Sequence, residues 1–254
     1  AGQGEGVHDA EAPFPRLHVG GLLMIILALD ALDLQQVRRF NCRNLMQKER
    51  GQTDLSDFEQ ARTVVLWASF LTGRNLEAEI PLATQWTYRV TPEETFLKYF
   101  RTPKTIDVPA LTYKQKNHEE ERRLLKTFFE EKASVVEYDS VIWRNHEENK
   151  RDFFTALSNH DLVMGYFNLA DAIGHLSFGV AEKMARVYRE LDQIAGGVKT
   201  PDKDLLIISD HGMKAVGRYG DHSHNGFYSF SRDLGLHLPK ITSFHTLLRR
   251  IGEG

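Results

Sequence analysis

The stretch Leu205 to Met213, with the sequence LLIISDHGM, constrains the fold of this chain more than any other. A short apolar run is followed almost at once by Asp210 and His211, and then by Gly212. Such a run is typical of a strand buried in the middle of a parallel sheet. Ligands of open α/β sheets bind at the carboxyl ends of the strands, so we expect Asp210 and His211 to lie at a binding edge. An Asp-His pair on its own also fits an ordinary polar turn.

The composition is that of an ordinary globular protein, with 41% hydrophobic and 26% charged residues in 254. A net charge of −3 without a dominant basic stretch gives no indication of specific nucleic-acid binding. No stretch reaches the roughly 18 to 20 apolar residues that a membrane span needs. The single cysteine, Cys42, excludes an intramolecular disulfide and fits a reducing compartment. Because no credible signal peptide is seen either, we expect a cytoplasmic location.

The chain divides into a leader and one large domain. Residues 1–21 are rich in glycine and lack periodicity, so we predict a flexible leader there and a single α/β domain over residues 22–254. Residues 77–134 differ in composition, with several prolines and aromatic residues, and include a charged, amphipathic helix predicted over residues 117–132. We interpret this segment as a small cap over the sheet edge. A short strand is predicted next, over residues 135–143.

Two further predicted strands are followed by acidic residues. Residues 22–29 form a continuous apolar run that ends at Asp30. A strand predicted over residues 161–166 is followed by Asp171 and then by His175. Four residues are about one helical turn, so these two side chains can face the same point.

Thr63 precedes an apolar segment of helical character. Residues 64–71 are predicted to form a buried helix that ends at Gly73, with Thr63 at its N-cap or in its first turn. There the hydroxyl would meet unpaired backbone N–H groups and the positive end of the helix dipole. Simple capping explains a threonine at this position equally well.

Acidic and imidazole side chains thus follow four predicted strand ends or the loops beside them. Six such ligands can hold two divalent ions a few ångströms apart, an arrangement that stabilises the entering and leaving oxygens of a phosphoryl transfer. A threonine hydroxyl beside a metal can act as the nucleophile. The candidate ligands are Asp30, Asp171, His175, Asp210, His211 and either His222 or His224.

This series of residues resembles the alkaline phosphatase superfamily, and most closely its type I phosphodiesterase/nucleotide pyrophosphatase branch with its compact archaeal and bacterial-type members. The resemblance covers about residues 22–251. It implies a three-layer α/β/α fold with a largely parallel central sheet flanked by helices. The residues that carry it, in order, are Asp30, Thr63, Asp171-x-x-x-His175, Asp210-His211-Gly212-Met213 and His222.

The resemblance also implies roles. Thr63 would attack phosphorus and form a covalent intermediate that water later hydrolyses. Zinc is the usual ion of this branch, with manganese or magnesium in relatives, and the set of three histidines and three aspartates suits zinc. His222 is preferred to His224 because His-Ser-x-x-Gly-Phe-Tyr resembles the ligand turn of the family. One ion would be held by Asp30, Asp210, His211 and the Thr63 oxygen, and the other by Asp171, His175 and His222.

The chain departs from the family pattern at Leu66. Relatives usually have an asparagine three residues after the nucleophile, as a donor to a phosphate oxygen. Arg62, Lys114 or a backbone N–H near Thr63 is a candidate replacement, and His224 is a further candidate contact with substrate. The chain is also shorter than most family members, so contacts with a nucleoside do not carry over.

These residues predict a two-metal hydrolase of phosphate esters, acting as a phosphodiesterase or nucleotide pyrophosphatase on a small phosphate ester or a nucleotide. One alternative is a phosphomonoesterase or phosphomutase on the same scaffold. The other is a metal-binding interaction protein that has lost catalysis. Leu66 favours the last alternative, whereas the nearly complete set of ligands argues against it.

Overall fold

The computed structural model describes residues 24–254. The predicted leader, residues 1–21, lies outside the described residues, as do the first two residues of the predicted first strand.

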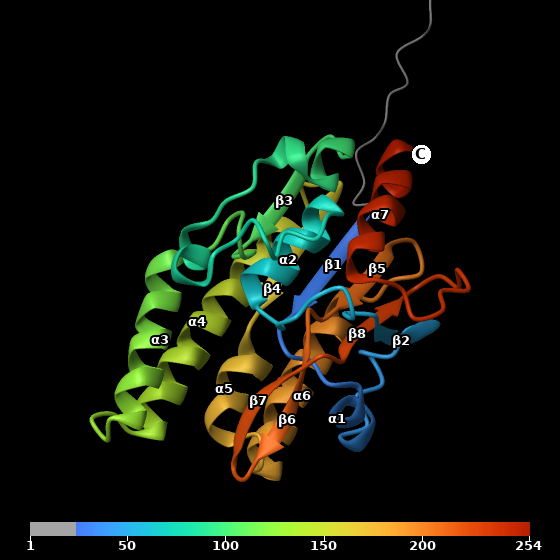
Figure 1. Ribbon diagram of the computed structural model, residues 1–254. Coiled ribbons are helices and arrows are strands. Elements are labelled where there is room, and N and C mark those ends of the chain that lie inside the picture. Colours follow the sequence, from blue (N-terminus) through green and yellow to red (C-terminus); the bar gives the residue numbers. More distant parts are fainter. Residues whose placement is uncertain (1–23) are drawn as a thin grey trace, which may run out of the picture.

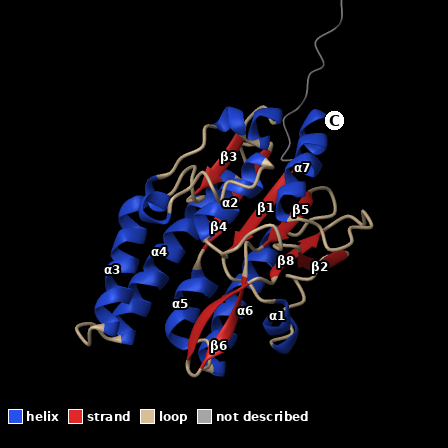
Figure 2. Ribbon diagram, viewed as in Figure 1, coloured by secondary structure: helices blue, strands red, loops and turns tan. Residues whose placement is uncertain are grey.

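A six-stranded sheet forms the centre of the molecule, in the order β2-β8-β5-β1-β4-β3 (Figures 1 and 2). Strand β1 pairs in parallel with β4 and with β5, and β4 pairs in parallel with β3. Strand β8 runs antiparallel to both of its neighbours. The strands are β1 (Met24–Leu29), β2 (Glu49–Thr53), β3 (Pro103–Ile106), β4 (Leu162–Phe167), β5 (Asp204–Ile208) and β8 (Gly226–Phe230).

Helices cover both faces of this sheet. Alternate residues of β1 point to opposite sides, as the pleat of a strand requires. Ile25 and Leu27 pack with residues of α1, α4, α5 and α6, whereas Met24 and Ile26 pack with residues of α2 and α7. The predicted three-layer α/β/α architecture is confirmed. The helices are α1 (Leu34–Arg39), α2 (Thr63–Thr72), α3 (Gln115–Phe129), α4 (Val135–Ala156), α5 (Leu169–Ser177), α6 (Ala181–Val198) and α7 (Phe244–Glu253).

The strand predicted over residues 135–143 is wrong, because these residues begin the helix α4. Two β-branched residues, Val135 and Val136, favoured a strand. Ser134 decides the outcome, since its hydroxyl caps the helix by accepting a hydrogen bond from the Glu137 backbone N–H at 3.1 Å. Tyr138, Val141 and Ile142 then follow at helical spacing and are buried.

Helix α2 is buried on all sides. Each of its ten residues is buried. The helix ends at Gly73, whose backbone takes the left-handed conformation with φ of 72°, as predicted from the sequence. A helix without a solvent-facing side is rigidly packed, so the residue that begins it, Thr63, has a fixed position.

The segment 77–134 contributes to the main sheet as well as to its surroundings. Its strand β3 is the edge strand beside β4, and its helix α3 packs against α4. Between α2 and β3 the chain forms three short 3-10 helices. They are η1 (Leu82–Thr87), η2 (Pro92–Glu94) and η3 (Phe96–Tyr99); a fourth, η4 (Ile241–Ser243), precedes α7.

A two-stranded hairpin projects from the carboxyl end of the sheet. Its strands are β6 (Gly212–Val216) and β7 (Tyr219–Ser223), and β7 packs on α5 (Figure 1). The contact is close: a Cβ at Gly174 of α5 or at Gly220 of β7 would lie within 2.4 Å of the Met213 sulfur. Glycine at these two positions therefore lets the hairpin approach α5.

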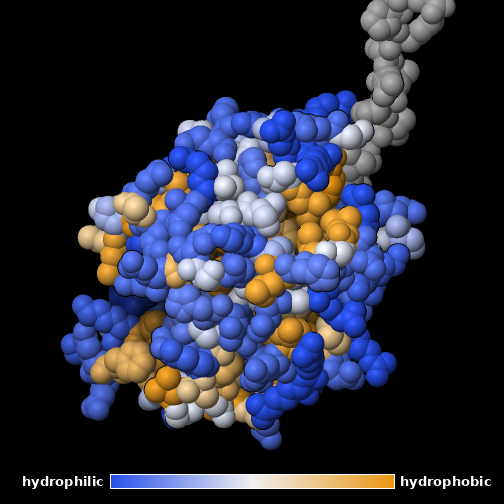
Figure 3. Space-filling view, turned by 45° about the vertical axis from the view of Figure 1, so that its right-hand side comes forward, coloured by the Kyte–Doolittle hydropathy of each residue, from blue (hydrophilic) through white to orange (hydrophobic). Residues whose placement is uncertain are grey.

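The surface is mostly hydrophilic, with separate apolar patches between the polar residues (Figure 3). Val136 and Phe129 are among the exposed apolar side chains, at 73% and 60% exposure. Within residues 24–254, no helix is long and apolar enough to cross a membrane.

Candidate metal centre

Three side chains meet at the carboxyl ends of the two central strands. Asp30 directly follows β1, and Asp210 and His211 follow β5. The His211 Nε2 atom lies 3.2 Å from Asp30 Oδ1 and 3.4 Å from Asp210 Oδ2. All three side chains are at most 2% exposed. The pairing of β1 with β5 thus brings together residues that are 180 positions apart.

Each of these side chains is held by one atom and leaves another atom free. The second Asp30 oxygen, Oδ2, accepts a hydrogen bond from the Tyr166 hydroxyl, and Asp210 Oδ1 accepts one from the Ala31 N–H at 3.4 Å. His211 Nδ1 lies 3.0 Å from the Gly212 carbonyl, so it carries the proton and donates, leaving Nε2 as a lone-pair donor. The three converging atoms have no hydrogen-bond partner: Asp30 Oδ1, Asp210 Oδ2 and His211 Nε2.

A second group adjoins the first. Asp171 and His175 lie one turn apart on α5, as the sequence predicted, with His175 Nε2 at 3.3 Å from Asp171 Oδ2. His222, on β7, places its Nε2 at 3.2 Å from Asp171 Oδ1. Its other nitrogen, Nδ1, donates to the Ala61 carbonyl at 2.9 Å. Asp171 Oδ1 is a fourth buried atom without a hydrogen-bond partner.

The two groups form one continuous set of ligands. The rings of His211 and His222 stack with centroids 3.9 Å apart. Ligand atoms of Asp30, Asp210 and His211 lie within 4.8 Å of one another, as do those of Asp171, His211 and His222. His211 is therefore common to both triads. We call these six residues the carboxyl-edge cluster: Asp30, Asp171, His175, Asp210, His211 and His222.

The electrostatics of the carboxyl-edge cluster are those of an acidic site that needs a cation. Burial, and next the charge of Asp30 beside it, raise the pKa of Asp210 well above its usual value. Burial also opposes ionisation of Asp171, but His175 and His222 outweigh it and hold the pKa of Asp171 well below the usual range. Buried polar atoms are nearly always paired, so four unpaired ones around one point need a partner. Carboxylate oxygens and neutral imidazole nitrogens fit a divalent transition-metal ion.

Thr63 is the first residue of α2, and the chain just before it contacts this cluster. The bond from His222 to the Ala61 carbonyl ties the chain two residues before Thr63 to the second group. Arg62 occupies the N-cap position, and its side chain makes no capping hydrogen bond. The first turn of α2 therefore keeps N–H groups that no capping side chain occupies. Leu66, in contrast, is fully buried among the core residues of α2.

The charged groups of two predicted substrate-binding residues are occupied elsewhere. The Arg62 guanidinium donates to the carbonyls of Ile80, at 2.8 Å, and Glu77, at 3.2 Å. The Lys114 ammonium forms ion pairs with Glu148 and Asp152 on α4, at 2.8 and 2.7 Å. The third residue, His224, has an exposed side chain in the turn after β7. The structure thus brings the six predicted protein ligands together but does not bring the charged groups of Arg62 and Lys114 to them.

Sequence reasoning missed Tyr166, which contacts the cluster directly. It is the fifth residue of β4, inside an otherwise apolar strand, and its hydroxyl donates to Asp30. A phenol in a buried strand must find a partner for its hydroxyl, and that requirement is a usable signal. The sequence alone does not say which acceptor it finds.

A second buried group of charges lies under α3. His118 is held between two carboxylates, with its Nε2 at 2.9 Å from Asp107 Oδ2 and its Nδ1 at 2.9 Å from Glu121 Oε2. Amides from Asn145, Asn149 and Asn168 donate to the same carboxylates, and the Lys114 N–H donates to Asp107. Every carboxylate oxygen in this group is thereby satisfied. We call Asp107, His118 and Glu121 the His118 cluster.

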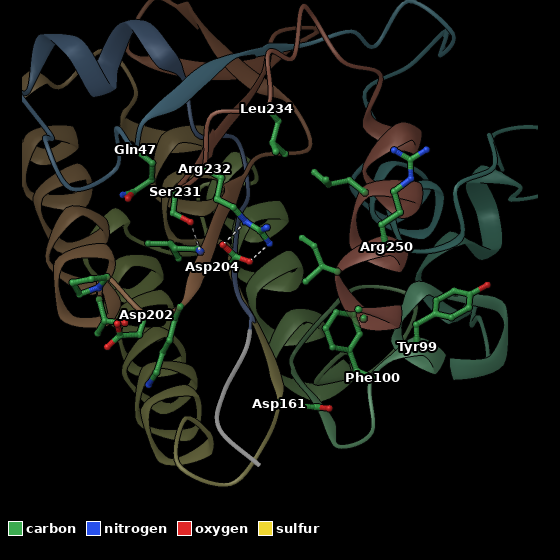
Figure 4. Close-up of a pocket in the computed structure, with 18 of the residues that line it drawn as sticks. Gln47, Tyr99, Phe100, Asp161, Asp202, Asp204, Ser231, Arg232, Leu234 and Arg250 are labelled. Carbon is green, nitrogen blue, oxygen red and sulfur yellow. Dashed lines mark hydrogen bonds and ion pairs between the residues drawn. The ribbon is translucent and has the colours of Figure 1, made fainter. Parts of the chain in front are cut away.

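Two other features lie away from the carboxyl edge. His146, Glu147 and Glu190 also lie within ligand distance of one another, but the Lys150 ammonium already forms ion pairs with both glutamates, at 2.9 and 2.7 Å. A cavity of about 1650 Å³ lies at the opposite, amino-terminal end of the strands (Figure 4). It is lined by residues such as Asp161 and Asp204, and Asp204 is paired there with Arg232. Neither feature adjoins Thr63.

Comparisons with known proteins give only distant similarities. No protein-family model matches the chain, and no curated protein does. Among solved structures, murine ectonucleotide pyrophosphatase/phosphodiesterase 5 is similar at 12% identity and a TM-score of 0.44, over 77% of this chain and 58% of that protein. The human ectonucleotide pyrophosphatase/phosphodiesterase 5 is similar at 14% identity and a TM-score of 0.42, over 77% and 58%.

An inactive T72A form of the murine protein, in complex with AMP, is also similar, at 11% identity and a TM-score of 0.44 over 78% of this chain and 59% of that one. The chain therefore spans less than two thirds of the length of these proteins. At these identities and TM-scores the likeness assigns no activity to this chain, and the function has to be argued from its own residues.

Proposed function

We propose that the chain is a two-metal hydrolase of phosphate esters, with Thr63 as the nucleophile and phosphodiesters or nucleotide pyrophosphates as substrates. One observation carries the proposal. Four buried polar atoms without partners converge at the carboxyl edge of a parallel sheet, beside the uncapped N-terminus of a fully buried helix. The unpaired carboxylate and imidazole atoms call for cations, and the free helix N-terminus favours an anion. A phosphate ester bound between cations and a helix N-terminus fits both requirements.

The residues divide into two neighbouring ligand sets, which are in contact through His211 and His222. Asp30, Asp210 and His211 would hold one divalent ion together with the Thr63 oxygen. Asp171, His175 and His222 would hold the second. Zinc suits these donors best, and manganese or magnesium would fit the carboxylates. Two such ions, when bound, would neutralise the charge on the entering and leaving oxygens during phosphoryl transfer.

The chain supplies the remaining parts of the reaction. The Thr63 hydroxyl would give up its proton to solvent and its oxygen would form a bond to phosphorus, while the bond from phosphorus to the leaving oxygen breaks. The leaving oxygen takes up a proton from solvent. Water then attacks the same phosphorus, which breaks the Thr63–phosphorus bond, returns a proton to Thr63 and releases the phosphate product. Because α2 is buried on all sides, Thr63 is positioned without reorganisation at each step.

The backbone at the start of α2 would replace the asparagine that relatives carry at the position of Leu66. Leu66 faces the core and is not exposed. The N–H groups of the first turn are oriented along the helix axis and lie next to Thr63. They would donate to the non-bridging phosphate oxygens, which is the role of an oxyanion hole.

The variant Thr63→Ala tests the nucleophile. We expect hydrolysis of bis-p-nitrophenyl phosphate to fall by at least about 1000-fold, because removal of a nucleophile leaves only positioning and charge stabilisation. Metal content, measured by atomic emission, should stay at two ions per chain. Thr72→Ala, which removes a hydroxyl from the other end of the same helix, is the matched control, since that hydroxyl only bonds to the Ala68 carbonyl. Unchanged hydrolysis by Thr63→Ala would exclude this mechanism.

The same assay separates the classes of substrate. A phosphodiesterase hydrolyses bis-p-nitrophenyl phosphate in preference to p-nitrophenyl phosphate, whereas a phosphomonoesterase does the opposite. Metal binding without hydrolysis of either ester would indicate an interaction protein.

A further inference from the structure

We infer that Tyr166 is a positioning residue for the metal centre: its hydroxyl fixes Asp30 as a one-oxygen ligand and so raises the affinity of the buried ion site. This inference rests on the proposed two-ion site and deepens it. Tyr166 touches neither substrate nor a metal ligand atom. It acts through the far oxygen of Asp30, and the sequence pattern assigns it no role.

The register of the sheet explains how the phenol reaches Asp30. Tyr166 of β4 lies directly opposite Ala28 of β1. Side chains two positions apart on a strand point to the same face, so Asp30, two residues after Ala28, follows on the face that Tyr166 occupies. The small side chain of Ala28 leaves room for the longer one beside it. Trp67 packs edge-on against the Tyr166 ring, with centroids 5.8 Å apart, and the ring is fully enclosed.

The two oxygens of Asp30 are thereby given different tasks. Oδ2 accepts the Tyr166 hydroxyl, while Oδ1 faces His211 Nε2 and has no hydrogen-bond partner. A carboxylate with one oxygen bonded in this way cannot rotate to present both oxygens, so it binds a cation through one. The same holds for Asp210 and His211: Asp210 Oδ1 and His211 Nδ1 bond to backbone groups, and the other side-chain atom of each faces the site. Of the three residues, only Asp30 is held by another side chain, through its Oδ2 atom. A mutation of that side chain can therefore remove the hydrogen bond.

Partners of this kind set metal affinity because they fix ligand orientation, and their loss typically costs about 10- to 100-fold. Tyr166→Phe removes only the hydroxyl and keeps the ring that packs on Trp67. Asp30 would then be free to rotate, or to turn Oδ1 away from His211. We expect weaker binding at the triad of Asp30, Asp210 and His211, with little change at the triad that contains Asp171.

The experiment is a zinc titration against a competing chelator in an Asp171→Asn background, where the second site is disabled. That protein should bind one zinc ion, and adding Tyr166→Phe should raise its dissociation constant by about 10- to 100-fold. Tyr228→Phe is the matched control: this buried tyrosine, on β8, donates to the Leu236 carbonyl at 3.0 Å, away from the site. Its dissociation constant should stay within about twofold of the background.

The outcomes separate the two proposals. An unchanged dissociation constant in Tyr166→Phe would overturn the positioning role and leave the two-ion site intact. If neither the unaltered protein nor the Asp171→Asn protein binds zinc, the proposed function itself is overturned. If Tyr166→Phe does not fold, the Asp171→Asn protein alone is used: zinc binding should then perturb a buried tyrosine in the ultraviolet difference spectrum, because Asp30 accepts the Tyr166 hydroxyl. Zinc binding without a tyrosine signal would also contradict the role of Tyr166.

Discussion

The carboxyl-edge cluster and the His118 cluster are built from the same chemistry and have opposite properties. Both bring buried carboxylates within about 3 Å of imidazole nitrogens. In the His118 cluster, every carboxylate oxygen accepts a hydrogen bond, and three asparagines and a backbone N–H complete the set. In the carboxyl-edge cluster, four buried atoms have no partner. Residue type therefore does not distinguish a site from a structural ion network, whereas hydrogen-bond satisfaction does.

The difference follows from what surrounds each cluster. Both lie at strand ends, since Asp107 directly follows β3, but the His118 cluster is enclosed by α3, α4 and the start of α5, whose side chains supply donors. At the carboxyl-edge cluster, backbone groups and the Tyr166 hydroxyl serve only one atom each of Asp30, Asp210 and His211. The unpaired atoms, Asp30 Oδ1, Asp210 Oδ2 and His211 Nε2, face one another. Burying them together is unfavourable unless a cation lies between them.

The largest contrast is expected between Asp210→Asn and Asp107→Asn. Asp210→Asn removes a metal ligand, so metal affinity and ester hydrolysis should fall at least about 100-fold. It also removes a carboxylate that is buried beside Asp30 and whose Oδ2 has no hydrogen-bond partner, so the metal-free protein should become more stable. Each 1 kcal/mol gained would raise the thermal midpoint by about 2 to 4 °C.

Asp107→Asn should do the reverse. Removing one partner of a buried ion pair costs about 3 kcal/mol, so the midpoint should fall, while metal content stays at the unaltered value. Asparagine is a suitable replacement because Asp107 has a φ of 59°, which asparagine tolerates. Thermal unfolding in the presence of a chelator, with metal analysis in parallel, gives both results. A loss of stability in both variants would remove the distinction between the clusters.

A change in stability of similar size, without an effect on the metal site, is expected from pH, and it concerns the His118 cluster. Burial lowers the pKa of His118, but Asp107 and Glu121 outweigh it and raise the pKa to about 9. A histidine whose pKa is higher in the folded than in the unfolded chain stabilises the fold below its unfolded value, near 6.5, and this contribution is lost as the pH rises through about 9. The loss amounts to about 3 kcal/mol between pH 6 and pH 10.

Urea unfolding of metal-free protein at a series of pH values measures this loss. His118→Gln should show a flatter dependence over the same range, because the titrating group is gone. A decline of equal size in His118→Gln would assign the pH dependence to other groups.

The smallest effect is expected for Lys114→Ala. Its ammonium pairs with Glu148 and Asp152 in a partly exposed position, and such pairs contribute roughly 0.2 to 1 kcal/mol. Hydrolysis should remain within about twofold of the unaltered protein. A large fall in activity with unchanged stability would instead indicate that Lys114 contacts the substrate.

Local patterns in the sequence predicted the three central strands and six candidate ligands that the structure brings together, but they did not predict β2, β3 or β8. Apolar runs predicted β1, β4 and β5, and the acidic residues at their ends followed from the runs. The start of α4 was mistaken because the two valines suggested a strand, and the cap at Ser134 outweighs them. Tyr166 and the ion pairs of Lys114 were missed for another reason: both depend on which residues meet across the fold, which no local pattern encodes.

The order of strands in the sheet has a consequence for the growing chain. The proposed ligands and nucleophile come from positions 30, 63, 171, 175, 210, 211 and 222. Strand β1 in the centre is flanked by β4 and β5, which are synthesised far later. Contacts across such separations form slowly, since long loops must close first. The ligands therefore cannot assemble on the ribosome until the chain beyond position 222 has emerged. Uptake of the metal ion would then mark the completion of folding.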